Sequence, residues 1–233
     1  VNVNVLHLYG TNETKKLPLV LTHHYFKLMV SKEKIIEVAS LLFVEHGVKS
    51  ITIDRIVKQL HTSKRTIYKH FEDKTTLLEA CLAAYHKTIK KENEDIIQAS
   101  ENAIQAMGYL HQRIVFRASQ TNPNFFNDII HYYPGLLQKS YRATGNFAKQ
   151  QLADLADWGA KDGLFRENLD IEVTSKTVLA LLELLKNTNR FPIEKYSKER
   201  LTFGIMLPYL RGVCTPKGME QLEKQEELFK VLL

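Results

Sequence analysis

The chain has 233 residues, a net charge of +6 and an isoelectric point near 9.1. No stretch approaches the roughly 18 apolar residues that a membrane-spanning helix needs, and two cysteines, Cys81 and Cys214, are too few for a disulfide framework. These features exclude membrane-spanning and disulfide-rich classes, and we expect a cytoplasmic protein of one large or two smaller domains, with no membrane partner.

Positive charge is concentrated near the front of the chain. Residues 31–75 contain nine Lys or Arg and six Asp or Glu, so half of the net charge lies in less than a quarter of the sequence. A basic segment is compatible with a nucleic-acid partner, although charge alone does not establish one.

Residues 1–30 differ from everything that follows. They lack sustained hydrophobic periodicity, whereas the chain is strongly helical from Ser31 onward. We predict an N-terminal extension over residues 1–30 that is either disordered or not native, with Met29 as the hypothesised natural start.

Three short helices and then a long one are predicted within residues 31–100. Each short helix follows an N-cap residue, Ser31, Thr52 or Ser63, whose side-chain oxygen can accept from a free N–H of the first turn. Only two residues turn the chain between the second and third helices, which therefore form a helix-turn-helix. The fourth helix is expected over about residues 74–100.

The third helix has two different faces. At about 100° per residue, Ile67 and Phe71 share one face, and Arg65 and Lys69 share the opposite face. A helix this short is not stable alone, so the apolar pair must hold it against other helices. It then presents two long basic donors outward, as a DNA recognition helix requires.

The rest of the chain is also predicted to be helical, which gives an all-α fold. Apolar periodicity, interrupted by Pro and Gly, indicates helices near residues 101–119, 123–131, 135–162, 170–188, 196–212 and 216–231. Pro208 lacks a backbone donor and should kink the helix in which it lies.

A set of residues between positions 35 and 78 matches the pattern of a known family. Its members are Phe43, Gly47, Ile51, Thr52, Ile53, Ile56, Ser63, Lys64, Thr66, Ile67, Tyr68, His70, Phe71, Lys74, Leu77 and Leu78. In this combination they resemble the DNA-binding domain of TetR/AcrR-type bacterial transcriptional regulators, and a weaker match lies at residues 163–172. The resemblance implies a helix-turn-helix domain over 31–78, joined by a long helix to an effector-binding and dimerisation domain over 79–233.

The segment departs from that family in two places. The turn before the capping serine usually holds Gly-Val in the family, and here it holds His61-Thr62. A glycine relieves a left-handed backbone there. Histidine tolerates that region better than a β-branched residue does, so we expect the turn to be kept at a small cost. Arg65 replaces a residue that is often small in the family. We expect this second departure to affect which DNA sequence the protein prefers.

The candidate DNA-contacting residues form two groups. Base-edge contacts are expected from Lys64, Arg65, Thr66 and Lys69, because arginine can bind guanine O6 and N7 together. Phosphate contacts are expected from Thr52, Ser63, Tyr68, His70 and Lys74. The alternative is a solvated basic face, and for His70 a histidine at the surface or core edge.

The resemblance also implies a pocket for a small-molecule effector among the C-terminal helices. Its candidate lining residues are Tyr109, Phe116, Phe126, His131, Tyr132 and Trp158. Aromatic residues at helical spacing are also what an ordinary core contains, so the existence of a pocket and the identity of the effector stay open.

Two late helices carry broad apolar faces and are the candidate homodimer interface. Their candidate residues are Val178, Leu181, Leu182, Leu185, Leu201, Ile205, Met206 and Tyr209. In the resembling family such a pair forms a four-helix bundle across a two-fold axis, which would match a pseudo-palindromic operator. The alternative is the core of a monomer.

The sequence contains no His-Glu-x-x-His, no Gly-x-Ser-x-Gly and no paired-cysteine zinc spacing. We therefore expect a transcriptional regulator that binds duplex DNA, without enzymatic activity, metal or cofactor. A ligand-responsive repressor acting as a homodimer is the leading hypothesis. The alternatives are a helical enzyme or interaction module with a structural N-terminal unit, and a DNA-binding factor without a small-molecule effector.

Overall fold

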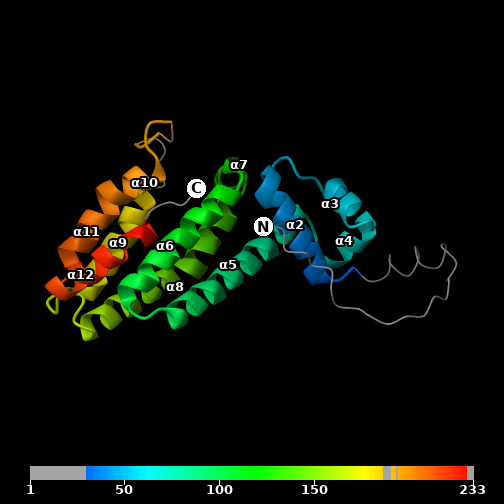
Figure 1. Cartoon of the computed structure of the whole chain (residues 1–233). Helices are drawn as coiled ribbons and strands as arrows, with labels where there is room; N and C mark the ends of the chain where they lie inside the picture. Colours follow the sequence, from blue (N-terminus) through cyan, green and yellow to red (C-terminus); the bar gives the residue numbers. More distant parts are fainter. Residues whose placement is uncertain (1–29, 186–189, 193, 230–233) are drawn as a thin grey trace, which may run out of the picture.

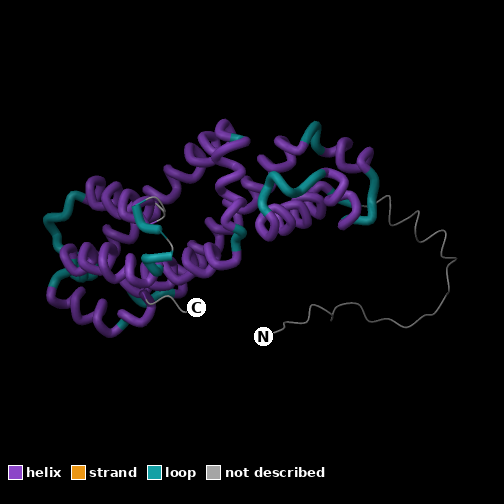
Figure 2. Tube along the Cα trace, turned by 90° about the horizontal axis from the view of Figure 1, so that it is seen from above, coloured by secondary structure: helices purple, strands orange, loops and turns teal. Residues whose placement is uncertain are grey.

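The computed structural model describes residues 30–185, 190–192 and 194–229 (Figures 1 and 2). Within these ranges the chain is helical except for loops and one isolated antiparallel bridge between Phe165 and Cys214, so the predicted all-α fold is confirmed. None of the described helices is long and apolar enough to cross a membrane. The extension predicted over residues 1–30 lies, up to residue 29, outside the described residues.

The front of the chain forms four helices, as predicted. They are α2 (Lys32–His46), α3 (Ile53–Gln59), α4 (Lys64–His70) and α5 (Lys74–Ala99). Ser31, Thr52 and Ser63 are the N-caps of the three short helices, and each side chain accepts from the backbone N–H three residues further on. Asp73 caps α5 and forms a reciprocal capping box with Thr76.

The back of the chain forms seven α-helices and two shorter helical turns within the described residues. The α-helices are α6 (Ala103–Gln120), α7 (Pro123–Tyr132), α8 (Pro134–Lys161), α9 (Ile171–Leu185), α10 (Lys198–Leu201), α11 (Leu207–Val213) and α12 (Pro216–Lys224). A π-helical turn (Thr202–Met206) joins α10 to α11, and a 3-10 turn (Glu226–Phe229) follows α12.

Pro208 distorts its helix, but the distortion is a widened turn. The N–H of Leu207 bonds to the carbonyl of Thr202, five residues back, where a regular α-helix would bond four residues back. Pro208 has no N–H, and its ring would clash with the carbonyl of Gly204 in a regular helix. The predicted single helix is therefore divided into α10, the π turn and α11.

The hydrophobic core beneath the front helices is not made by those helices alone. It contains Ile35, Phe43 and Ile67, but also Phe125 and Ile129 of α7, which are 4% and 1% exposed. Figure 1 shows α7 beside α2, where the two lobes of the molecule meet. A second core lies between α6, α11 and α12 in the other lobe.

Hydrogen bonds fix α7 against the end of α2. The backbone N–H of Asn122 donates to the Val44 carbonyl at 2.8 Å, and its side-chain Nδ2 donates to the Glu45 carbonyl at 3.1 Å. These carbonyls belong to the last turn of α2, and carbonyl groups there have no hydrogen-bond donor within the helix. Asp128 Oδ2 accepts from the Lys49 N–H at 2.6 Å, in the loop that leads to α3. We call this set of three hydrogen bonds the α7–α2 contact.

A carboxylate held by two arginines joins α5 to α6. Arg113 Nε and Nη2 donate to the two oxygens of Glu92 at 3.1 and 2.7 Å, and Arg117 donates to the same carboxylate. Hydrogen bonding from Arg113, reinforced by Arg117, lowers the pKa of Glu92 from 4.5 to about 2.

This arrangement predicts a stability contribution that depends on pH. Because the folded pKa of Glu92 lies below its unfolded value, the contribution is complete above about pH 4.5 and is lost as the pH falls toward 2. Glu92→Gln should lower the free energy of unfolding by about 1 kcal/mol at pH 7, and the difference should shrink on acidification. Urea unfolding of both proteins between pH 7 and pH 3 measures it.

Glu220→Gln is the matched control, because Glu220 pairs with Lys224 on the exposed face of one helix. An exposed pair of this kind contributes little, about 0.3–0.5 kcal/mol. A Glu92→Gln difference that stays constant from pH 7 to pH 3 would contradict the assignment of the shifted pKa to this carboxylate.

Candidate nucleic-acid interface

Helix α4 packs against the front core on one face and is exposed to solvent on the opposite face. Ile67 is fully buried and Phe71 is 5% exposed, both within the front core. Arg65 and Lys69 are exposed on the other side of the helix. The two-faced orientation predicted from helical periodicity is confirmed. That Arg65 and Lys69 contact DNA stays a prediction.

The start of α4 is fixed by two hydroxyl groups. Ser63 Oγ accepts from the Thr66 N–H at 3.2 Å and lies 3.0 Å from the Thr66 hydroxyl. Thr52 uses its hydroxyl in the same way at the start of α3, where it accepts from the Arg55 N–H at 3.3 Å. The hydroxyls of Thr52 and Ser63, both predicted to contact phosphate, therefore also hold the helix starts in place.

The turn between α3 and α4 has the left-handed backbone that the sequence predicts. His61 has a φ of +48°, the only positive φ of a non-glycine residue in the described part of the chain. Its N–H bonds to the Lys58 carbonyl at 3.2 Å, and the Thr62 N–H bonds to the Val57 carbonyl at 3.1 Å. The chain thus keeps the turn without a glycine.

This backbone makes the turn sensitive to the shape of residue 61. His61→Val should lower the free energy of unfolding by about 1–2 kcal/mol, because a β-branched side chain is strained at positive φ. His61→Gly should lie within about 0.5 kcal/mol of wild type, since relief of strain offsets the greater entropy of the unfolded chain. Urea unfolding followed by circular dichroism gives the order. Equal stability of the Val and His proteins would contradict the strained turn.

Two of the predicted DNA-contacting lysines are engaged within the protein. Lys64 Nζ pairs with Asp54 Oδ1 at 2.8 Å, which links α4 to α3, and this hydrogen bond raises the pKa of Lys64. Lys74 Nζ donates to the Val48 carbonyl at 2.6 Å, and burial lowers the pKa of Lys74. Each would have to leave or share its protein partner to contact DNA.

The other two predicted phosphate contacts differ in exposure. Tyr68 is 50% exposed on α4, whereas His70 is only partly exposed at the end of the same helix. A phenol that stands in solvent can reach a phosphate without any rearrangement. Tyr68 is therefore the more accessible of the two.

The structure does not bring the predicted effector-pocket residues together. Helices α6 and α7 bury Leu110 and Ile129 on their inner faces, and most of the predicted aromatic rings lie elsewhere on these helices. The exposed members are Tyr109, Phe116, Phe126, His131 and Tyr132. Trp158 is the exception, because it is partly buried on α8 and lines an open cleft.

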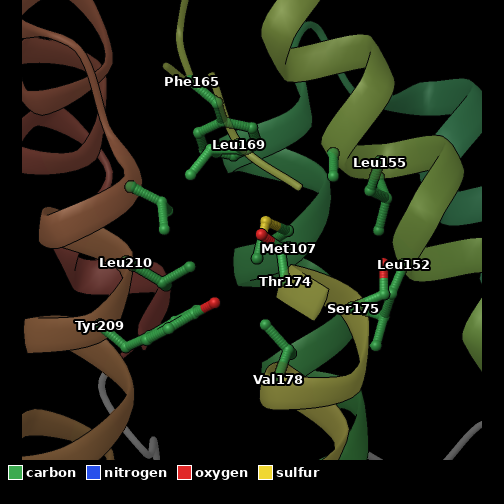
Figure 3. A pocket seen from close by; sticks show the side chains of 12 residues that line it. Met107, Leu152, Leu155, Phe165, Leu169, Thr174, Ser175, Val178, Tyr209 and Leu210 are labelled. Carbon is green, nitrogen blue, oxygen red and sulfur yellow. The ribbon is translucent and has the colours of Figure 1, made fainter. Parts of the chain in front are cut away.

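A small cavity lies instead between α6, α8, α9 and α11 (Figure 3). Apolar side chains from these helices surround it, among them Met107, Leu155 and Leu210, and the Tyr209 hydroxyl points into it. Its volume is about 20 Å³, which is room for about one water molecule. The sequence pattern did not identify this set, because apolar residues on four helices give no signal that separates a cavity from a packed core.

The candidate dimer residues divide into two groups. Val178, Leu201 and Met206 are 5–6% exposed and lie in the interior of the protomer itself, so they have little surface left for a partner. Those that keep partly exposed apolar surface are Leu181, Leu182, Leu185, Ile205 and Tyr209. A partner chain would therefore contact mainly the second group.

Asn122 and Asp128 are residues that the sequence did not single out. Asn122 precedes Pro123 at a predicted helix start, which marks it as a cap. Its second role, as donor to the last turn of α2, joins positions 77 residues apart and leaves no local pattern.

Helices α3 and α4 are both capped, are joined by a tight turn, and are packed on the front core through Ile67 and Phe71. This arrangement defines a protein of the helix-turn-helix class. Residues 35–81 match the family profile described as bacterial regulatory proteins, tetR family. The N-terminal domain is therefore of the TetR type, and about 80% of the chain shares the fold of a TetR-type transcriptional regulator.

Sequence similarity to the curated relatives covers a short part of the chain. An HTH-type transcriptional regulator of Staphylococcus aureus strain USA300 is 43% identical over 47 residues, which are 20% of this chain and 25% of that protein. The match thus spans about a quarter of the length of the curated relatives.

Similarity to solved structures extends over both lobes. A TetR-family regulator from Cytophaga hutchinsonii has a TM-score of 0.65 and 17% identity, over 80% of this chain and 96% of that one. A regulator from Saccharomonospora viridis, solved in complex with choline, has a TM-score of 0.62 and 18% identity, over 79% and 97% of the chains. At such identities the likeness shows a shared fold.

Proposed function

We propose that this protein is a DNA-binding transcriptional regulator that acts as a homodimeric, ligand-responsive repressor on a pseudo-palindromic operator. The observation that carries the proposal is α4, a short helix pinned by Ile67 and Phe71 that presents Arg65 and Lys69 to solvent. A rigid mount and outward basic donors are what reading a DNA groove requires.

The homodimer is supported by apolar surface that the protomer leaves partly open. Leu181, Leu182 and Leu185 on α9, and Ile205 in the π turn, are partly exposed in the single chain. Burial of such surface against a second copy is favourable. A two-fold arrangement would present two α4 helices to two half-sites of an operator.

Ligand response requires a physical link from the C-terminal helices to α4. The α7–α2 contact supplies a candidate, because Asn122 and Asp128 bond to the end of α2 and to the loop before α3. Phe125 and Ile129 extend that link into the core that carries α4. A ligand that binds better to one position of α7 would therefore bias the position of the front helices.

The test is binding of the full chain to duplex DNA taken from upstream of its own gene. Fluorescence anisotropy should show tighter binding to this duplex than to a scrambled one of equal length, with affinity falling steeply as salt rises. Light scattering after size-exclusion chromatography should give the mass of a dimer. Binding without salt dependence or sequence preference would favour a helical enzyme or interaction module instead.

A further inference from the structure

An open cleft lies between the second half of α5 and α8. Its volume is about 320 Å³, which reaches the lower end of the range for small-molecule sites. Ile97 from α5 and Phe147, Leu155 and Trp158 from α8 give it an apolar and aromatic surface. Leu155 also lines the small cavity of Figure 3, so the two spaces share this side chain.

The charged side chains that line this cleft are both acidic. Glu94 projects from α5 and Asp154 from α8, both are exposed, and the remaining polar lining residues are glutamines. Gln150 Nε2 donates to Asp154 Oδ1 at 2.8 Å, which holds this carboxylate at the rim. In a chain with a net charge of +6, the lining of the cleft thus carries two negative charges, of which Glu94 is paired with Lys90 at the edge.

The chain already places one ammonium group at the edge of the cleft. Lys90 Nζ lies 5.5 Å from the centre of the Phe147 ring and 3.8 Å from Glu94 Oε1. An aromatic face together with a carboxylate is the pairing that attracts an organic ammonium ion. Lys90 therefore marks the position that a cationic ligand would compete for.

We propose that the α5–α8 cleft binds an organic cation that carries an apolar or aromatic body. The apolar body would lie on Trp158 and Phe147, and the positive charge would face Glu94 and Asp154. This identifies the class of effector for the ligand-responsive regulator proposed above, and in that respect it rests on the proposed function. Because α5 begins in the front core at Leu77 and Leu78 and ends at the cleft, a ligand that separates α5 from α8 acts on the helix that carries the front domain.

Tetraphenylphosphonium is a suitable probe, with tetraphenylborate as an isostere of opposite charge. Trp158 is the only tryptophan of the chain, so its fluorescence reports occupancy of the cleft without DNA. The phosphonium should change this fluorescence and give a saturable isotherm by calorimetry. The borate should bind at least about tenfold more weakly at the cleft, because the two carboxylates repel it.

Charge variants give effects of opposite sign. Glu94→Gln and Asp154→Asn should each weaken phosphonium binding about twofold to fivefold, whereas Lys90→Gln should strengthen it about twofold by removing the internal competitor. Asp157→Asn is the matched control. Asp157 lies on α8 and pairs with Lys161, but it does not line the cleft, so affinity should not change.

The inference is overturned if the phosphonium fails to bind, if the borate binds as tightly, or if the Glu94→Gln/Asp154→Asn double variant binds as wild type does. These outcomes are separate from failure of the proposed function, which is measured by DNA binding alone. A protein that binds its upstream DNA but not the cation overturns only this inference. A protein that binds the cation but no DNA overturns the regulator and leaves the cleft assignment intact.

Discussion

Replacement of Arg65 or Lys69 by alanine is expected to weaken operator binding by about 5-fold to 150-fold for each residue, or about 1–3 kcal/mol. Both side chains are exposed on the face of α4 opposite Ile67, so their removal leaves the packing of Ile67 and Phe71 in the core intact. Loss of Arg65 should also reduce the difference in affinity between the operator and a scrambled duplex, because a base-edge contact carries sequence information. Anisotropy titrations at one fixed salt concentration measure both quantities.

Two controls separate base reading from loss of charge. Lys161→Ala removes one positive charge from an exposed site in the other lobe, and it should leave operator affinity within about twofold. Titrations at several salt concentrations then distinguish base contacts from phosphate contacts, since loss of a phosphate contact lowers the salt slope by about one. Survival of both affinity and preference in the Arg65→Ala/Lys69→Ala protein would show that α4 is not the reading helix.

Gly218→Ala is expected to reduce the free energy of unfolding by about 2–3 kcal/mol and to lower Tm by about 5–10 °C. A Cβ at this position would lie 2.0 Å from the Leu164 carbonyl oxygen and 2.9 Å from its carbon. Both atoms are backbone, and the same carbonyl accepts from the Thr215 N–H at 2.9 Å. The start of α12 would therefore have to move away from the Gly163–Leu164 loop, with loss of this hydrogen bond.

Gly212→Ala is the matched control for this substitution. Gly212 lies in α11, and a Cβ there would meet no atom within 4 Å. Alanine is the better helix former, so this protein should be more stable than wild type by about 0.5–1 kcal/mol. Thermal and urea unfolding of the two variants should thus shift in opposite directions. Equal shifts would mean that the close approach of α12 to Leu164 does not exist in solution.

The front of the fold could be predicted from the sequence because its determinants are local. Ser31, Thr52 and Ser63 cap their helices through bonds that span three residues, and the spacing of Ile67 and Phe71 fixes which face of α4 is buried. The left-handed turn at His61 was also predictable, because the pattern around it requires that backbone whichever residue occupies it.

The cavity and the exposure of the candidate dimer residues could not be predicted in the same way, because they depend on how distant helices meet. Helical periodicity identifies an apolar face but not the element that covers it. Val178 and Leu201 have the pattern expected at an interface, yet the protomer itself buries them. Phe116 and Phe126 have the pattern expected of core residues, yet they are 54% and 46% exposed.

Pro208 shows a third limit. The missing donor is evident in the sequence, and a distortion follows from it. The sequence does not say whether the helix bends or widens into a π turn. Thr202, whose carbonyl accepts the widened bond, is 1% exposed, and its hydroxyl lies 3.2 Å from the ring nitrogen of His111 on α6. That contact spans 91 residues and has no local signature.

The position of α7 has a consequence for how proteins of this architecture can exchange parts. A recombination point at the end of α5 would separate the helix-turn-helix from Phe125 and Ile129, which complete its core, and from Asn122, which completes the end of α2. The hybrid would inherit a DNA-reading unit with an exposed apolar gap and unpaired carbonyls. Functional chimeras, natural or engineered, should therefore keep α7 together with α2–α5, and because α6 lies between them in the chain, this unit is discontinuous in sequence although it is continuous in space.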